Sequence, residues 1–223
     1  IPTSQKVILF FDELPWLAQK RSGFLSELDY IWNLHFSKMP NVLVVICGSA
    51  ASWMIKNIVR NRDGLYGRLS EQIRLNAFTL QETEEYLKAY QINLNRKQLV
   101  ELYMTTGGVA KYLTLIPRGR STAQIIDELC FTSQGPLLTE FTDLYLSLFD
   151  EAERHILIVR ALATKKSGMT RTQISNATRI PTGGRLSTIL TELEESGFIM
   201  SIPEFGLASS ERRYRLIDEY SLF

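Results

Sequence analysis

The sequence predicts an α/β segment with a parallel sheet, then a mostly helical region, then a small unit of helices and a hairpin. Three observations lead to this fold class. Two continuously apolar segments, 7–11 and 42–47, enclose a helical pattern. From residue 81 to 149 apolar residues recur mainly at helical spacing. After residue 150, short helical patterns precede two strand-like segments, and 223 residues are enough for this organisation.

The first elements form a strand–helix–strand pattern. Residues 7–11 are continuously apolar, which is typical of a strand buried on both faces in a parallel sheet. Apolar residues recur at three- and four-residue spacing from Phe24 to His35, and indicate an amphipathic helix. Pro40 ends that helix, and residues 42–47 form the second apolar strand. We therefore expect a parallel pair with a right-handed crossover.

The middle of the chain is predicted to be mainly helical. A helix is expected at 52–59 and a short strand at 72–77. Thr79 and Glu82 have the spacing of a capping box that begins a helix, and Asn95 is the expected cap of the next one. Further helices are predicted at 109–115, 123–131 and 137–149.

The last part resembles a winged helix, a variant of the helix-turn-helix. Helices are predicted at 151–164 and 182–196, with a short one between them that Thr170 caps. Residues 197–199 and 214–217 flank a segment with Pro, Gly and Ser, as two strands of a hairpin do. The predicted domains are therefore 1–78, 79–149 and 150–223.

Composition and charge exclude several classes of protein. With 25 Lys+Arg and 24 Asp+Glu, the net charge of +1 excludes nucleic-acid binding by bulk charge but permits a local basic patch. The longest uncharged segment contains Pro40 and Gly48, so no membrane span is expected. No secretory signal is visible, and Cys47 and Cys130 are expected to be buried, reduced thiols of a cytoplasmic protein.

Polar residues follow both predicted strands at the same sheet edge. Asp12 and Glu13 end the first strand, where a carboxylate can hold Mg²⁺ and a second can polarise water. They can equally end the strand and cap the next turn. The second strand ends in 48–52 (GSAAS), and a hydroxyl there can contact a phosphate or an attacking water. The alternative is a tight turn with Ser49 or Ser52 as helix cap.

Four segments resemble the AAA+/STAND ATPases, especially the archaeal-type ATPase group. Residues 10–17 (FFDELPWL) resemble the Walker B segment of this family, and 45–54 (VICGSAASWM) its sensor 1 strand. Residues 65–68 (LYGR) resemble its arginine segment, and 106–113 (TGGVAKYL) its GG-x-P-x-Y-L lid segment. The family also carries a C-terminal winged helix. The resemblance implies α/β plus all-α architecture: a truncated parallel-sheet P-loop NTPase core, a helical lid and a winged helix.

The resemblance also implies roles for individual residues. Asp12 would coordinate Mg²⁺ through water, and Glu13 would orient and activate the hydrolytic water. Ser49 would lie in the sensor 1 position, near the γ-phosphate of ATP. Arg68 would stabilise phosphate charge, in the same chain or from a neighbouring subunit; the alternative is a surface arginine.

The lid segment fits the family less completely. Gly107 and Gly108 would let the lid backbone approach the nucleotide, or would simply end a helix. Val109 stands where the family usually has proline, which weakens the expectation that this lid holds the base in the usual way.

The phosphate-binding loop of the family has no counterpart in this sequence. No G-x-x-x-x-G-K-[ST] pattern occurs, and only six residues precede the first strand. The chain also begins with Ile1 rather than Met. We therefore expect the C-terminal portion of a longer ATPase, or a chain that has lost the loop. The chain alone is predicted not to hydrolyse ATP.

The predicted winged helix offers a second functional surface. Arg185 lies on its presumed recognition helix, and Arg212, Arg213 and Arg215 lie near its wing, where they can reach phosphate or the minor groove. Residues 150–223 carry ten basic and ten acidic side chains. The expected partner is DNA, another protein or a second copy of the chain; the alternative is that this unit packs against the ATPase core. The alternative function is a non-enzymatic winged-helix DNA- or protein-binding module with a degenerate core.

Overall fold

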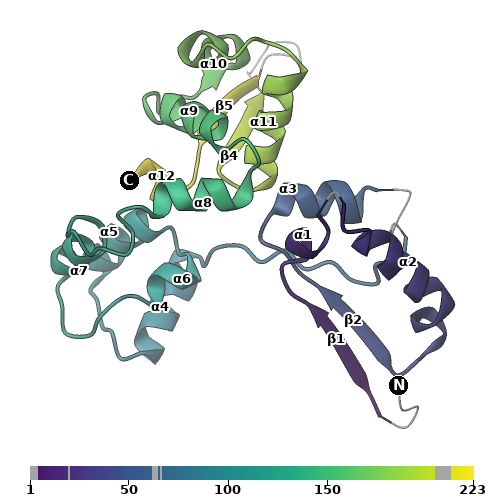
Figure 1. The fold of residues 1–223 in the computed structure, drawn as a ribbon. Helices are drawn as coiled ribbons and strands as arrows, with labels where there is room; N and C mark the ends of the chain where they lie inside the picture. Colours follow the sequence, from purple (N-terminus) through teal and green to yellow (C-terminus); the bar gives the residue numbers. More distant parts are fainter. Residues whose placement is uncertain (1–4, 20, 62–64, 66, 204–211) are drawn as a thin grey trace. The chain divides into compact units, whose positions relative to one another are not determined.

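The computed structural model describes residues 5–19, 21–61, 65, 67–203 and 212–223, and it divides into two compact units. Unit 1 is Ile1–Ile73 and unit 2 is Arg74–Phe223 (Figure 1). The boundary between the units therefore falls after Ile73. The predicted domain boundaries after residues 78 and 149 remain predictions. Within the described ranges, none of the helices has both the length and the apolar character needed to cross a membrane.

Unit 1 is built on two parallel strands. Strand β1 (Val7–Phe11) pairs with β2 (Val42–Ile46), in a register that runs from Val7 opposite Val42 to Phe11 opposite Ile46. Helix α2 (Phe24–Leu34) and the 3₁₀ turn η1 (Phe36–Lys38) connect them. The predicted parallel strand–helix–strand unit is therefore confirmed. Three further elements follow strand ends: α1 (Leu14–Leu17), α3 (Ala51–Met54) and the π-helical turn η2 (Ile55–Val59).

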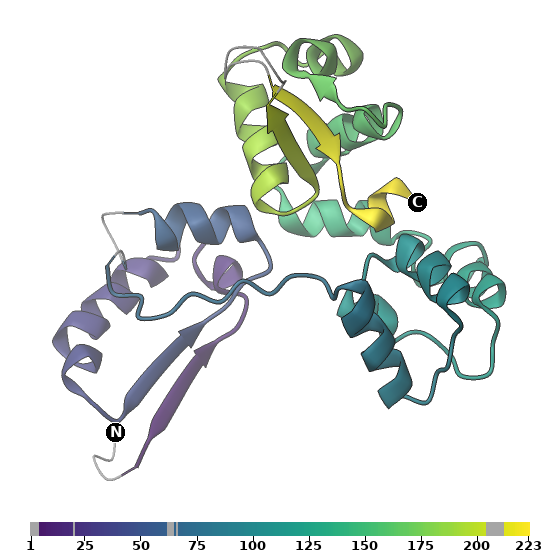
Figure 2. The same ribbon diagram turned by 180° about the vertical axis from the view of Figure 1, so that it is seen from behind.

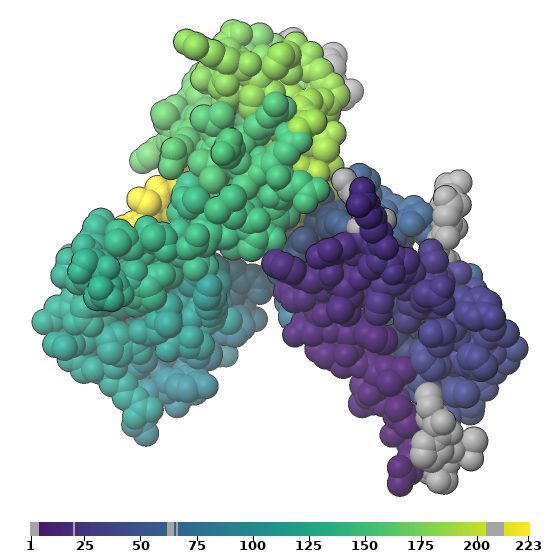
Figure 3. Space-filling model, viewed as in Figure 1, coloured from purple at the N-terminus to yellow at the C-terminus, as the bar shows by residue number. Residues whose placement is uncertain are grey.

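Only one face of this sheet is covered. The small core of unit 1 contains Leu14, Leu28, Ile58 and Leu65, with Phe11, Phe24 and Ile46 packed against it. On the other face, Ile8 is 67% exposed, Phe10 59% and Leu43 52%, and β1 lies at the surface of the unit (Figure 3). The prediction of strands buried on both faces is therefore wrong for these residues, because no described segment of unit 1 covers them.

The strand predicted at 72–77 is absent. These residues are extended but unpaired, and Ile73 and Leu75 are 76% and 91% exposed. Their alternation suits a strand, but a strand needs a neighbour to pair with its backbone. Within the described part of the chain this segment has no such neighbour.

The first half of unit 2 is helical, as expected. Its helices are α4 (Leu80–Ala89), α5 (Arg96–Thr106), α6 (Ala110–Leu113), α7 (Thr122–Cys130) and α8 (Glu140–Leu148). The Thr79–Glu82 capping box is confirmed, and Asn95 caps α5 through Gln98. A buried cluster that includes Leu87, Leu102, Tyr112 and Ile125 holds α4 to α7 together.

The second half of unit 2 combines three helices with a small antiparallel sheet. The helices are α9 (Ala152–Ala163), α10 (Arg171–Thr178) and α11 (Gly184–Glu195), and Thr170 caps α10 as predicted. Strands β3 (Met169–Thr170), β5 (Arg212–Leu216) and β4 (Ile199–Pro203) form a sheet in that order. The predicted hairpin is thus confirmed, and it lies alongside α11 (Figure 2). The turn predicted between its strands covers residues 204–211, outside the described residues.

A short terminal helix links the two halves of unit 2. In α12 (Glu219–Leu222), Tyr220 is buried in the α4–α7 cluster and its hydroxyl donates to the Leu137 carbonyl over 3.0 Å. The hydroxyls of Ser221 and Tyr145 are 3.0 Å apart, and Tyr145 belongs to the core around α9 and α11. Residues at the end of the chain therefore pack against both cores.

Candidate functional site

The parallel register brings the residues after β1 and β2 to one sheet edge. The Cys47 amide donates to the Phe11 carbonyl over 3.0 Å, and the Leu14 amide donates to the Cys47 carbonyl over 2.8 Å. These bonds continue the pairing for one step beyond the strands. Asp12 and Glu13 therefore lie beside Cys47 and Ser49, as expected for the carboxyl edge of a parallel sheet.

Asp12 is held through one of its two carboxylate oxygens. Its Oδ1 accepts hydrogen bonds from the Cys47 thiol at 2.7 Å and from the Glu13 amide at 3.0 Å. Among the described residues, no donor is hydrogen-bonded to Oδ2. The hydrogen bond to Asp12, followed by burial, raises the pKa of the Cys47 thiol, so the thiol remains protonated and can donate near neutral pH.

Glu13 combines an unusual backbone with a fixed side chain. Its φ of 46° lies in the left-handed region, which costs a residue with a Cβ roughly 1–2 kcal/mol. Its Oε2 accepts hydrogen bonds from the Ser49 hydroxyl at 3.0 Å and from the Ser49 amide at 3.2 Å. Strained backbones of this kind are often found at functional sites. The structure thus joins two of the predicted catalytic residues directly.

Gly48 is required by a close approach between the two strand ends. A Cβ at this position would lie 2.7 Å from Cδ of Pro15, whose ring begins α1. A larger residue would push α1 away from the end of β2. The glycine therefore sets the short separation over which Ser49 reaches Glu13.

Arg68 is placed against α2. Its guanidinium forms an ion pair with Asp29, and both side chains are about 70% buried. Tyr66 of the same predicted segment lies outside the described residues. The catalytic role of Arg68 therefore remains a prediction.

Gly107 and Gly108 have clear structural roles in unit 2. Gly107, with φ of 61°, is the C-cap of α5, which was one of the two interpretations of this pair. Gly108 has φ of 67°, and a Cβ there would lie only 2.1 Å from the Phe78 carbonyl oxygen. Their predicted contact with nucleotide remains a prediction.

Two of the four arginines predicted to bind DNA are engaged within unit 2. Arg185 forms an ion pair with Glu151. The Arg212 guanidinium donates to the Ser201 hydroxyl over 3.2 Å, and that hydroxyl donates to Glu194 over 2.6 Å. Arg212 therefore lies beside an acidic side chain of α11.

The other two arginines lie on the outer face of the hairpin. Arg213 is opposite Ile202 and Arg215 opposite Met200 in the β4–β5 register. Arg215 is exposed, and Arg213 is half-buried, with its guanidinium 3.5 Å from the Gly168 carbonyl. These two arginines share one strand face, because side chains alternate along a strand.

The contact made by Cys47 was not predicted from the sequence. The thiol was expected to be buried, whereas it is half-buried and bonded to Asp12; Cys130 is buried as expected, and both thiols are free. The positions of Asp12 and Cys47 relative to the two strands could have predicted this contact. Cys47 follows the second strand directly, as Asp12 follows the first, so a parallel register places them opposite each other.

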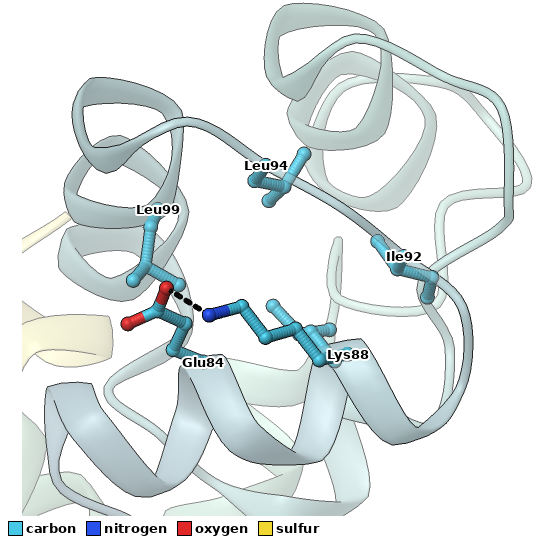
Figure 4. Close-up of a pocket in the computed structure, with 6 residues that line it drawn as sticks. Glu84, Lys88, Ile92, Leu94 and Leu99 are labelled. Atoms are coloured by element: carbon cyan, nitrogen blue, oxygen red, sulfur yellow. Dashed lines mark ion pairs between the residues drawn. The ribbon is translucent and has the colours of Figure 1, made fainter.

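A very small pocket in the α4–α7 region is lined by residues of α4, the loop after it and α5. Its volume is about 10 Å³, the space of one water molecule, and the Lys88–Glu84 ion pair of 2.6 Å lies beside its aliphatic walls (Figure 4). A more open groove of about 250 Å³ lies on the same region, with Tyr86, Tyr90 and Arg118 in its wall. Arg118 donates to Gln91 over 3.1 Å. The described residues contain no cluster of three or more side chains of the metal-binding types His, Cys, Asp and Glu.

A solved structure resembles almost the whole chain. The Walker-type ATPase PABY2304 of Pyrococcus abyssi matches 96% of this chain with a TM-score of 0.65 and 18% sequence identity. The match covers 61% of the length of that ATPase chain. The likeness shows that the chain shares the fold of the matched part of that Walker-type ATPase. No protein-family model matches the sequence, and a search of curated proteins gives no match.

Proposed function

We propose that this chain is the C-terminal portion of an AAA+/STAND-type ATP-binding protein that works as a nucleotide-driven switch. One observation carries the proposal: two carboxylates, on a strained turn after β1, bond directly to a thiol and a serine after β2. This sheet edge is where open α/β folds bind ligands. The likeness to a Walker-type ATPase supports the fold on which this proposal rests.

The donor set at this edge fits Mg²⁺. Magnesium prefers oxygen ligands, retains several waters and is commonly held by one or two carboxylates together with substrate phosphates. Asp12 offers Oδ2, since Oδ1 already accepts two hydrogen bonds. The bound ion would neutralise phosphate charge, while the Asp12 side chain itself fixes the direction of approach.

Glu13 and Ser49 supply the remaining groups of the proposed site. The Glu13 carboxylate would accept a hydrogen bond from the attacking water and orient it. In the present geometry Ser49 occupies Oε2 of Glu13, so Ser49 also controls where that carboxylate points. When ATP is bound, the Ser49 hydroxyl would contact the γ-phosphate instead.

The proposal includes roles outside this sheet edge. Arg68 would stabilise phosphate charge after leaving Asp29, in its own chain or in a neighbouring subunit. Gly107 and Gly108 would let the lid backbone approach the nucleotide. Closure of this lid would reposition the C-terminal helices and hairpin.

The test is hydrolysis and nucleotide-dependent stability. The 223-residue chain should release no phosphate from ATP with Mg²⁺, because its sequence contains no G-x-x-x-x-G-K-[ST] loop. The chain extended at its N-terminus by such a loop should gain thermal stability with ATP and Mg²⁺. In the extended chain, Glu13→Gln should retain this stabilisation and lose phosphate release. Turnover by the chain alone that Glu13→Gln abolishes would contradict the first expectation.

We further propose that residues 150–223 form a winged helix whose partner-binding surface includes the outer hairpin face. The order α9, β3, α10, α11, β4, β5 supports this assignment. For a DNA partner, Arg185 and Arg212 would first have to leave Glu151 and Ser201. Arg213 would have to leave the Gly168 carbonyl, and together with Arg215 it would then contact phosphates. Because these arginines already have partners within the chain, the contacts favour a protein partner over DNA.

A gel shift with duplex DNA separates these alternatives. A DNA-binding surface predicts that Arg213→Ala/Arg215→Ala weakens binding several-fold and lowers its salt dependence. Arg96→Ala/Lys97→Ala, at the start of α5, is the control for the loss of two positive charges. If DNA binding is absent, or is equal in both variants, the protein-binding module is the remaining alternative.

A further inference from the structure

Three hydrogen bonds hold Cys47 at the sheet edge. Its amide donates to Phe11 in β1, its carbonyl accepts from Leu14 in α1, and its thiol donates to Asp12. The hydrogen bonds of the Cys47 amide and carbonyl thus fix its backbone, and this places its thiol within hydrogen-bonding distance of the Asp12 carboxylate. Cys47 is therefore joined to the segments that precede and follow Asp12.

The thiol restricts how the Asp12 carboxylate can turn. An ionised carboxylate has two equivalent oxygens, and a single donor leaves the group free to pivot. Here the Glu13 amide and the Cys47 thiol meet at the same oxygen, Oδ1. The amide lies on the chain of Asp12 itself, whereas the thiol comes from the end of the neighbouring strand. Together they distinguish Oδ1 from Oδ2 and fix the plane of the carboxylate.

We propose that Cys47 is a positioning residue that holds Oδ1 of Asp12 and so presents Oδ2 to a divalent cation. The inference rests on the proposed function for the role of the cation, but the thiol–carboxylate contact stands apart from it. Hydrogen-bonding partners of metal-binding carboxylates orient the ligand, and their loss typically weakens metal affinity tenfold or more.

A purely structural role for Cys47 makes the opposite prediction. A half-buried cysteine can serve as a small apolar side chain that fills space at the strand end. Valine would then replace it well, because valine is apolar and suited to a strand, and serine would be worse. In the positioning role, serine retains a hydrogen-bond donor and valine removes it. The pair Cys47→Ser and Cys47→Val therefore separates the two roles.

The experiment uses the ¹⁵N-labelled 223-residue chain and Mn²⁺ as the probe. Paramagnetic broadening of the Glu13 and Ser49 amide signals reports ion binding at the sheet edge, even when it is weak. We expect Cys47→Ser to bind Mn²⁺ within about threefold of the unchanged chain and Cys47→Val about tenfold more weakly. Cys130→Ala is the control. It changes the second cysteine of the chain, which lies in unit 2, and should leave the Mn²⁺ titration unchanged.

A second measurement needs no metal. The infrared S–H stretching band of Cys47 should shift to higher frequency in Asp12→Asn, because a neutral amide oxygen is a weaker acceptor than a carboxylate. An unshifted band, or Mn²⁺ binding by Cys47→Val that equals that of the unchanged chain, would overturn the inference. A shifted band without selective broadening of the Glu13 and Ser49 signals would instead support the thiol–carboxylate contact and contradict the cation site of the proposed function.

Discussion

The two units of this chain differ in how completely they bury their apolar residues. In the described part of unit 2, the helices pack around two clusters of 17 and 12 buried residues. Leu186, Leu193 and Ile174 in the first cluster are fully buried. Among the described residues of unit 1, the core cluster has four buried members, and one face of the sheet is exposed. The larger buried cores therefore lie in unit 2, whereas the sheet edge with Asp12 and Glu13 lies in unit 1, which has the smaller core.

The difference shows what an apolar strand sequence requires. Strands of parallel sheets are apolar on both faces because layers cover both faces in α/β proteins. Strand β1 has this composition, but only its Phe11 side packs on the core of unit 1. The surface around Phe10 is therefore one that a further covering layer would stabilise, at roughly 25 cal/mol for each Å² of apolar area removed from water.

Separation of the two units should have the largest effect. We expect residues 74–223 alone to unfold in one cooperative thermal transition with dispersed amide signals. Residues 1–73 alone should show no cooperative transition, because four buried residues supply too small a core. Circular dichroism and ¹H–¹⁵N spectra of the two pieces test this contrast. If residues 1–73 unfolded cooperatively at the same temperature as residues 74–223, the proposed difference in stability between the units would be wrong.

A second prediction concerns the packing of unit 2. Gly108→Ala should lower the free energy of unfolding by about 3 kcal/mol, because its Cβ would lie 2.1 Å from the Phe78 carbonyl oxygen and the residue has positive φ. Phe78 cannot easily move, since its amide donates to the Gly108 carbonyl over 2.9 Å and Tyr103 donates to its carbonyl.

Gly119→Ala is the matched control, since Gly119 has φ of 74° but no atom lies within 4 Å of the place that a Cβ would occupy. It should cost only about 1 kcal/mol, the contribution of the left-handed backbone alone. Denaturant unfolding of both variants gives the difference. Equal losses would show that backbone conformation, and not the close approach, explains Gly108.

The sequence predicted best what short segments determine by themselves. The caps at Thr79, Asn95 and Thr170 were confirmed because each cap and its partner lie three residues apart. The strand at 72–77 was wrong because alternation supplies only half of a strand, and the other half is a pairing neighbour. Exposure of the Phe10 face could not be predicted either, since it depends on a second layer.

The candidate site shows the same division between local and distant information. The meeting of Asp12, Glu13 and Ser49 follows from parallel register, which two apolar runs predict. The partners of Arg185 and Arg212 depend on how α11 is rotated against its neighbours, and no local pattern specifies this. Placement on the presumed recognition helix and wing therefore suggested arginines available to DNA, where the structure has internal contacts.

A pH-dependent contribution to stability should belong to unit 2. His155 is buried, stacks on Phe149 with ring centroids 4.0 Å apart, and faces the Glu151 carbonyl and the Glu192 carboxylate. Burial lowers the pKa of His155, while Glu192 opposes the shift. The unfolded chain then binds more protons at this residue. The contribution is complete above pH about 6.5 and is lost as the pH falls below that value.

This effect should be the smallest of the three, and variants can isolate it. Replacement by glutamine in His155→Gln should remove one proton-linked step from the pH dependence of unfolding below pH about 6.5. His35→Gln, at the end of α2 in unit 1, should leave the unfolding of unit 2 unchanged. Because the buried imidazole lies in the better-packed unit, its titration should be coupled to cooperative unfolding. An identical pH dependence in all three proteins would show that the Glu192 contact cancels the effect of burial.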